Sequence, residues 1–276
     1  MPWVAEAIKP EVRDCVTSFY VANESSAGQP VPAGTGFFAF VPRRSDTTRM
    51  WNFLITAKHV VLNEQTRELE SPLWMRFNTK KGGAELVRID EGLKAGPYSV
   101  FFPNDPTLDL AVMLVEPDAS HVLVRSVGVE EFIGGRAKYQ RTVLGEGSDV
   151  FYPTLFVSAP GVARNQPIVR FGKIALLIVE RISWEGDMLD LHLVETHAYG
   201  GSSGAPVFVR TDDWKVLLLG VMKGHFIGPG HIRFEGKPLP PEQMNAAINL
   251  GIAAVIPAYL LHDFLNDVVA RLKTAP

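Results

Sequence analysis

The chain contains a single cysteine, Cys15, among its 276 residues. An intramolecular disulfide is therefore impossible, which excludes a disulfide-stapled secreted scaffold and fits a reducing compartment. Long apolar runs are also missing, because a membrane-spanning helix needs about 20 consecutive apolar residues and stretches such as Ile174–Val179 and Val216–Met222 are far shorter. The N-terminus lacks the basic start and apolar centre of a signal peptide. We therefore expect a cytoplasmic protein without a membrane partner.

The sequence also lacks an excess of charge of one sign. Its 27 basic and 30 acidic side chains give a formal net charge of −3. A protein that binds nucleic acid through a basic face is not expected from this balance. The hydrophobic fraction of 46% is typical of soluble globular proteins and supplies enough apolar surface for a sizeable core.

Turn-forming residues are abundant, with 24 glycines and 20 prolines. Between them lie short runs rich in Val, Ile, Phe and Leu, which are typical of β-strands. We predict strands at Val12–Val21, Gly36–Val41, Met50–Thr56, Leu73–Phe77, Glu85–Ile89, Tyr98–Phe102, Leu110–Val115, Val150–Val157, Ile168–Val179, Met188–Val194, Pro206–Arg210, Val216–Met222 and Asn249–Val255. Apolar residues at a spacing of three to four predict one long helix, Pro257–Lys273. The polar segment Glu116–Gly135 separates the two groups of strands and predicts a domain boundary.

Two segments in the first group of strands place ionisable side chains at strand ends. His59 follows the apolar run that ends at Thr56, and histidine side chains exchange protons near neutral pH. Asp109 opens the apolar run Leu110–Val115, where burial of a carboxylate is costly unless a partner meets it. Such a carboxylate could orient an imidazole. Taken singly, a structural histidine and a turn aspartate would look the same.

A third segment, Tyr199–Val209, places Ser202 and Ser203 between glycines and just before a strand. Glycine permits backbone angles that other residues avoid, so this turn could direct successive N–H groups at one oxygen, as an oxyanion hole requires. A hairpin loop has the same composition, so this segment indicates a catalytic site only when it is considered together with His59 and Asp109.

Together the three segments resemble the chymotrypsin-like (trypsin-fold) serine peptidases, and in particular their disulfide-free bacterial members. The resemblance rests on the terminal helix and on Thr35–Phe38, Thr56–His59, Asp109–Leu114, Gly201–Pro206 and Gly220–His225. It implies an all-β fold of two six-stranded antiparallel β-barrels with a C-terminal α-helix. Residues 1–118 would form the first barrel, 119–256 the second, and 257–276 the helix and tail.

The resemblance also implies the roles of the site residues. Ser203 would be the nucleophile of a serine endopeptidase, His59 its general base, and Asp109 the carboxylate that orients His59. The backbone N–H groups of Gly201 and Ser203 would form the oxyanion hole. This chemistry requires no cofactor and no metal, and the expected partners are a protein or peptide substrate and a regulatory protein.

The same resemblance indicates where a peptide would bind. It would pair with the edge formed by Lys223, Gly224 and His225, with its side-chain pocket lined by His197, Ala198, Tyr199 and Gly200. A packed, structural role stays open for His197 and His225. A metal site is not expected, because the histidines, which include His192 and His231, have neither a cysteine partner nor tight spacing.

Two other interpretations remain to be tested. Gly200–Gly204 also fits the Gly-x-Ser-x-Gly elbow of α/β-hydrolases, with Ser202 as the nucleophile. That motif needs a helix after the serine and the order Ser, Asp, His, whereas Pro206–Arg210 has the pattern of a strand. The other interpretation is a catalytically idle relative that binds peptides or partners.

Overall fold

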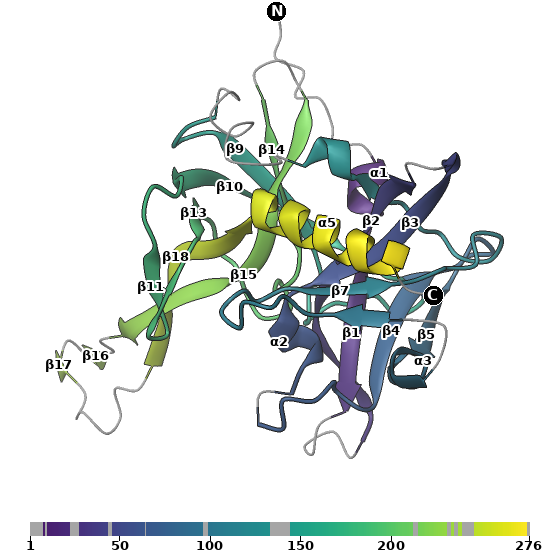
Figure 1. Cartoon of the computed structure of the whole chain (residues 1–276). Helices are drawn as coiled ribbons and strands as arrows, with labels where there is room; N and C mark the ends of the chain where they lie inside the picture. The colour runs from purple at the N-terminus through teal and green to yellow at the C-terminus, as the bar shows by residue number, and fades with distance from the viewer. Residues whose placement is uncertain are drawn as a thin grey trace, which may run out of the picture.

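The computed structural model describes residues 8, 10–22, 28–43, 46–63, 65–95, 99–132, 144–211, 215–230, 233–234, 237–238 and 246–274. These residues form two β units with a C-terminal helix lying across both, as Figure 1 shows. The mostly β architecture and the terminal helix confirm the fold class predicted from the sequence.

The first unit is an eight-stranded sheet with the order β5-β4-β1-β2-β3-β7-β6, in which β8 pairs separately with β2. Its elements are α1 (Pro10–Arg13), β1 (Val16–Ala22), β2 (Pro30–Arg43), β3 (Asp46–Thr56), α2 (Lys58–Val61), β4 (Leu73–Asn78), β5 (Ala84–Arg88), α3 (Asp90–Ala95), β6 (Ser99–Phe101), β7 (Ala111–Leu114), β8 (Val127–Gly128) and a 3-10 turn at Val129–Glu131. All its pairings are antiparallel except β2 with β8.

This sheet departs from the closed six-stranded barrel that was expected. Within the described residues, β5 and β6 stand at opposite ends of the strand order and do not pair with each other. The two end strands are poorly suited to closing the sheet, because β6 has only three residues and four of the five β5 residues are exposed to solvent. β8 follows residue 118 in the chain, yet it adds its short parallel ladder to β2 of this first unit.

The second unit is a closed six-stranded barrel with the order β10-β13-β18-β15-β14-β9. Its strands are β9 (Asp149–Thr154), β10 (Ile168–Leu176), β13 (His192–Glu195), β14 (Pro206–Arg210), β15 (Val216–Gly230) and β18 (Ala246–Pro257). Two hairpins stand outside it, β11 (Ile182–Trp184) with β12 (Asp187–Leu189), and β16 (Arg233–Phe234) with β17 (Lys237–Pro238). The closed antiparallel barrel agrees with the prediction for this half.

Helix α5 (Ala258–Thr274) matches the predicted helix within one residue at each end. Pro257 is the last residue of β18, where it pairs with Gly220, instead of the first residue of the helix. The buried helix residues Phe264 and Leu265 belong to one apolar cluster with Phe37 and Phe53 of the first unit and Phe208 of the second. The helix therefore ties the two β units together through a shared core.

Within the described ranges, no helix is both long enough and apolar enough to cross a bilayer.

Candidate active site

The pairing of β3 with β7 explains why His59 and Asp109 come together. Thr56, the last residue of β3, pairs with Ala111, the first residue of β7. His59 lies on the short helix α2 just after β3, and Asp109 lies just before β7. Val60 and Val61 are buried and anchor this helical turn to the sheet. Two residues that are 50 positions apart in sequence therefore meet at one end of neighbouring strands.

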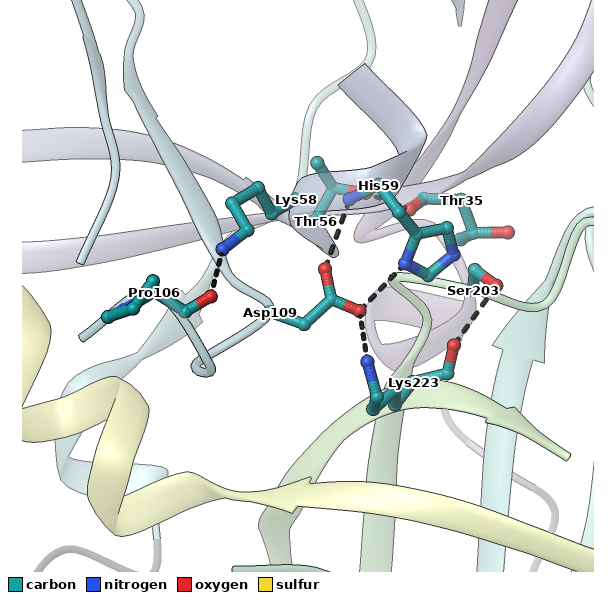
Figure 2. A network of polar contacts seen from close by, with 8 residues as sticks. All are labelled: Thr35, Thr56, Lys58, His59, Pro106, Asp109, Ser203 and Lys223. Carbon is teal, nitrogen blue, oxygen red and sulfur yellow. Dashed lines mark hydrogen bonds and ion pairs between the residues drawn. The ribbon is translucent and has the colours of Figure 1, made fainter. Parts of the chain in front are cut away.

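Asp109 holds His59 with both carboxylate oxygens. Oδ1 accepts the backbone N–H of His59 at 3.0 Å, and Oδ2 lies 2.7 Å from Nδ1 of the ring (Figure 2). Burial of Asp109, which is 6% exposed, by itself raises the pKa of the carboxyl. The hydrogen bond and charge of His59 and the ammonium of Lys223 outweigh burial and lower that pKa to about 2. Asp109 is therefore a stable carboxylate at neutral pH.

The loop between β13 and β14, residues 196–205, which we call the nucleophile loop because it contains the expected nucleophile Ser203, has a backbone that only glycine accepts at two positions. Gly201 and Gly204 have φ angles of +89° and +81°. A Cβ on Gly204 would lie 2.1 Å from the carbonyl oxygen of Thr35, so glycine is needed for both its φ angle and its close contact. The Gly204 N–H donates to the Met222 carbonyl at 2.8 Å, which fixes the loop to β15.

Thr35 on β2 connects this loop to the first unit. Its N–H donates to the Ser203 carbonyl at 2.9 Å, and its hydroxyl donates to the Gly201 carbonyl at 2.7 Å. The same hydroxyl accepts the Leu155 N–H at 2.9 Å, and Thr35 is fully buried. The sequence identified Thr35 only as part of a resembling segment and missed this role. A threonine before a glycine carries no local signal that it will bind a loop more than 160 residues away.

The Gly201 and Ser203 N–H groups are the expected oxyanion donors, and their surroundings differ: Ser203 lines the cavity, whereas Gly201 is buried beside it. Across the described residues, neither group has an acceptor within hydrogen-bonding distance. Thr35 and, at a longer 3.4 Å, Thr154 hold the Gly201 carbonyl from the buried side, which fixes the peptide plane between Gly201 and Ser202. An oxyanion hole requires preorganised N–H donors beside the serine, and these two N–H groups are the candidates for that role.

Ser203 itself lies beside Lys223. Its hydroxyl donates to the Lys223 carbonyl at 3.2 Å, and no hydrogen bond joins it to His59 in the part of the chain that the structure describes. Hydrogen bonds between catalytic groups are often long or poorly aligned without substrate and shorten once it binds. Ser203 and His59 line the same cavity, so the groups are brought together without a direct bond.

That cavity has a volume of about 620 Å³ and contains most of the residues that the sequence assigned to substrate binding. The predicted residues that line it are Ala198, Tyr199, Gly200, Lys223, Gly224 and His225. The cavity volume is within the range of about 300–1,000 Å³ that small ligands and side chains occupy in binding sites.

His225, one of the residues that line the cavity, has a lowered pKa because it is partly buried.

His197 is placed elsewhere. Ala198 points inward and is 1% exposed, so its exposed neighbour His197 faces outward and lines a separate open groove along β10. The His197 carbonyl accepts a hydrogen bond from Arg170 in that groove. The assignment of His197 to the pocket floor is therefore corrected, because the alternation of side chains at the end of β13 turns it away from the cleft.

Within the residues described, no group of three or more His, Cys, Asp or Glu side chains is arranged to hold a metal ion. His192 is buried, and its Nδ1 accepts the Ile178 N–H at 3.1 Å. His231 lies outside the described residues.

The chain has the fold of trypsin-like serine protease domains, in which two strand-built units are joined by a C-terminal helix. The MamO protease domain from Magnetospirillum magneticum (apo form) has a TM-score of 0.53 and 13% identity, over 92% of this chain and 97% of that one. The Rv3671c protease from M. tuberculosis in its active form has a TM-score of 0.47 and 15% identity, over 90% and 78%. Its inactive form has a TM-score of 0.48 and 14% identity, over 90% and 86%. No protein-family model and no curated protein sequence matches this chain.

Proposed function

We propose that this protein is a serine endopeptidase that hydrolyses peptide bonds through Ser203, His59 and Asp109. The observation that carries the proposal is the 2.7 Å contact between His59 Nδ1 and Asp109 Oδ2 in the cavity that also contains Ser203. A serine hydroxyl is a weak nucleophile at neutral pH and needs a neighbouring base. An imidazole held by a buried carboxylate supplies that base.

The reaction divides into acylation and deacylation. Ser203 Oγ bonds to the scissile carbonyl carbon while its proton passes to Nε2 of His59, and the N–H groups of Gly201 and Ser203 stabilise the oxyanion. The C–N bond then breaks, and the amine leaves with the proton from His59. Water attacks the resulting ester with His59 again as base, which releases the acid and restores Ser203.

The edge of β15 offers a place for the substrate backbone. β14 pairs with β15 only as far as Val221, and the following residues of β15 pair with β18 on the other side. The side of β15 beyond Met222 therefore has no strand partner within the described residues. An extended peptide can add there as an antiparallel strand through main-chain hydrogen bonds, next to the lined cavity and Ser203.

A fluorophosphonate probe tests the proposal, because it phosphonylates a serine only when a base activates it. We expect one labelled peptide that contains Ser203, and no label in Ser203→Ala or His59→Ala. Ser202→Ala is the matched control, since Ser202 is adjacent and only 3% exposed, and it should keep the label. The α/β-hydrolase interpretation fails on the fold, because strand β14 and not a helix follows the serines, and label on Ser202 in the wild type would refute Ser203 as the nucleophile.

An idle peptide-binding module is the second candidate. The observation that favours it is the Ser203 hydroxyl, which is bonded to the Lys223 carbonyl and not to His59. This candidate predicts that the folded wild type takes no label and cleaves nothing in an unbiased peptide library, yet retains extended peptides at the β15 edge. Cleavage of any library peptide that Ser203→Ala abolishes would exclude it, and the cleaved sequences would also define the side-chain preference of the pocket.

A further inference from the structure

Lys223 touches both ends of the proposed catalytic group. Its Nζ lies 2.9 Å from Oδ2 of Asp109, while its carbonyl accepts the Ser203 hydroxyl at 3.2 Å (Figure 2). Asp109 belongs to the first unit and Ser203 to the second, so one residue contacts the functional groups of both. The sequence assigned Lys223 only to the backbone edge and gave its side chain no role.

The contact between Lys223 and Asp109 is a buried ion pair. The two side chains are 13% and 7% exposed, so solvent ions screen their interaction much less than they screen a surface pair. Oδ2 of Asp109 accepts hydrogen bonds from His59 Nδ1 at 2.7 Å and from Lys223 Nζ at 2.9 Å. A single oxygen atom therefore serves both the imidazole and the ammonium.

The hairpin of β11 and β12 holds Lys223 in this position. The Lys223 ammonium lies 5.6 Å from the centre of the Trp184 ring, within cation–π range. The same ring packs on Gly224, where a Cβ would come within 3.2 Å of it. Phe226 supports Trp184 from the side, with ring centres 4.8 Å apart. The ammonium is therefore confined between an aromatic ring and a carboxylate.

Other charged and titratable groups face the pair without touching the Asp109 carboxylate. Those that line the main cavity are Lys58, Arg67, Glu185, Asp187, Tyr199 and His225. A smaller neighbouring cavity that also contains Asp109 and Lys223 adds Asp105, Arg181 and Asp190. Lys58 bonds instead to the Pro106 carbonyl at 2.7 Å. These groups include both signs of charge, whereas Lys223 is the cation in direct contact with the carboxylate.

Building on the proposed peptidase function, we infer that Lys223 is a positioning residue whose ammonium fixes the Asp109 carboxylate through the oxygen that also binds His59. When His59 takes up a proton, a second cation forms against the oxygen that already holds the ammonium. Like charges this close disfavour each other. Removal of the ammonium should therefore make protonation of His59 easier and move the acid limb of activity to higher pH.

The test compares neutral and charged replacements of Lys223 by the pH profile of kcat/KM. We expect Lys223→Met to move the midpoint of the acid limb upward by about one pH unit, and Lys223→Arg to restore it. Lys173→Met is the matched control, because Lys173 is 57% exposed and pairs with Asp149 far from the cleft. Its acid limb should coincide with that of the wild type.

A second measurement does not depend on turnover. NMR signals of the His59 ring, assigned by their loss in His59→Gln, report the pH of half-protonation in the wild type and in Lys223→Met. The same upward shift of about one unit is expected. If the wild type neither takes the fluorophosphonate label nor cleaves peptides, the proposed function fails, while this titration still decides the role of Lys223.

Two results would overturn the inference. One is an unchanged midpoint in Lys223→Met, and the other is an equal shift in Lys223→Met and Lys223→Arg, which would assign the effect to packing instead of charge. If Lys223→Met does not fold, Lys223→Gln replaces it, since glutamine is neutral but can still donate to Asp109. An upward shift in Lys223→Gln supports the role of the charge, and no shift refutes it.

Discussion

The two β units carry different parts of the proposed catalytic group, and each unit positions its part in a different way. In the open sheet of the first unit, His59 and Asp109 follow from one strand pairing, β3 with β7. In the closed barrel of the second, Ser203 depends on the positive φ angles of Gly201 and Gly204. The contact between His59 and Asp109 is therefore set within one sheet, whereas its alignment with Ser203 depends on contacts between the units.

Among the contacts between the units, those of two residues lie next to the proposed site. Thr35 binds the nucleophile loop from the first unit, and Lys223 binds the carboxylate from the second. The units also bury different ionisable groups: Asp90 and Asp109 are buried in the first, and His192 in the second. Substitutions in the first unit should therefore affect mainly the catalytic rate, and substitutions in the second unit mainly the stability and its dependence on pH.

The largest effect is expected at the acid–base pair of the first unit. Asp109→Asn places an amide beside Nδ1 of His59, which favours the wrong tautomer, and kcat should fall about 10⁴-fold. Steady-state kinetics on a cleaved library peptide measure this loss. Asp118→Asn is the control, because Asp118 is exposed and bonds only locally to Ser120 and His121. A loss below tenfold in Asp109→Asn would show that Asp109 does not orient the base.

The second-largest effect is expected in the second unit, where a substitution should lower the free energy of unfolding. Gly204→Ala combines a strained φ angle with a clash against the Thr35 carbonyl, and we expect it to lower the free energy of unfolding by about 3 kcal/mol. Gly147→Ala is the matched control, because Gly147 has a φ of +90° but no atom within 4 Å of the added Cβ. It should cost about 1 kcal/mol. Equal costs in urea denaturation would show that the contact with Thr35 is unimportant.

Much of this comparison could be predicted from the sequence. Strands such as Met50–Thr56 and Pro206–Arg210 were recognisable because apolar β-branched and aromatic runs lay between turn residues. His59, Asp109 and Ser203 were recognisable because each stands at a strand end in a characteristic segment. The structure brings these three to one cavity.

Other features of the fold and the site could not be predicted, because they depend on contacts between distant residues that leave no local pattern in the sequence. Lys223 and Thr35 act on groups 114 and 166 positions away in sequence, and their neighbours in the chain do not show this. By contrast, the outward orientation of His197 follows from the alternation of buried and exposed residues that continues past the end of β13, and the resemblance to a family pocket was given more weight than this alternation. The missing pairing between β5 and β6 involves an exposed strand and a strand of only three residues, and short strands have weak sequence patterns.

A smaller effect should distinguish the two units by their acid sensitivity. Burial lowers the pKa of His192 from 6.5 to about 3, so the unfolded chain binds more protons in this interval and stability falls as pH decreases. At pH ~5 this contributes about 2 kcal/mol of destabilisation. Urea denaturation from pH ~7 to ~4.5 should show a flatter decline in His192→Asn than in the wild type.

Asp109 should act in a different pH window. Its folded-state pKa is lowered from 3.8 to about 2, so its stabilisation is present above 3.8 and is lost as pH falls toward 2. Above pH ~4 the decline should therefore depend on His192 and not on Asp109. Parallel declines in His192→Asn and the wild type over that range would contradict the assignment.

The smallest effect is expected at the contact between the units. Thr35→Val removes the hydroxyl that holds the Gly201 carbonyl, and we expect kcat to fall about tenfold through misplacement of the oxyanion hole. Thr35→Ser keeps the hydroxyl and should restore most of the rate. If Thr35→Ser loses as much activity as Thr35→Val, the methyl packing of Thr35 matters and its hydrogen bond does not.

The unpaired side of β15 has a consequence for what the proposed peptidase could cut. A strand edge binds backbone, and a helix or a paired strand in a folded protein has no free backbone to offer it. Only segments that are already extended, or that unfold locally at small cost, can enter the cleft. The mobility of a client protein would thus select the cut site before any side chain reaches the pocket.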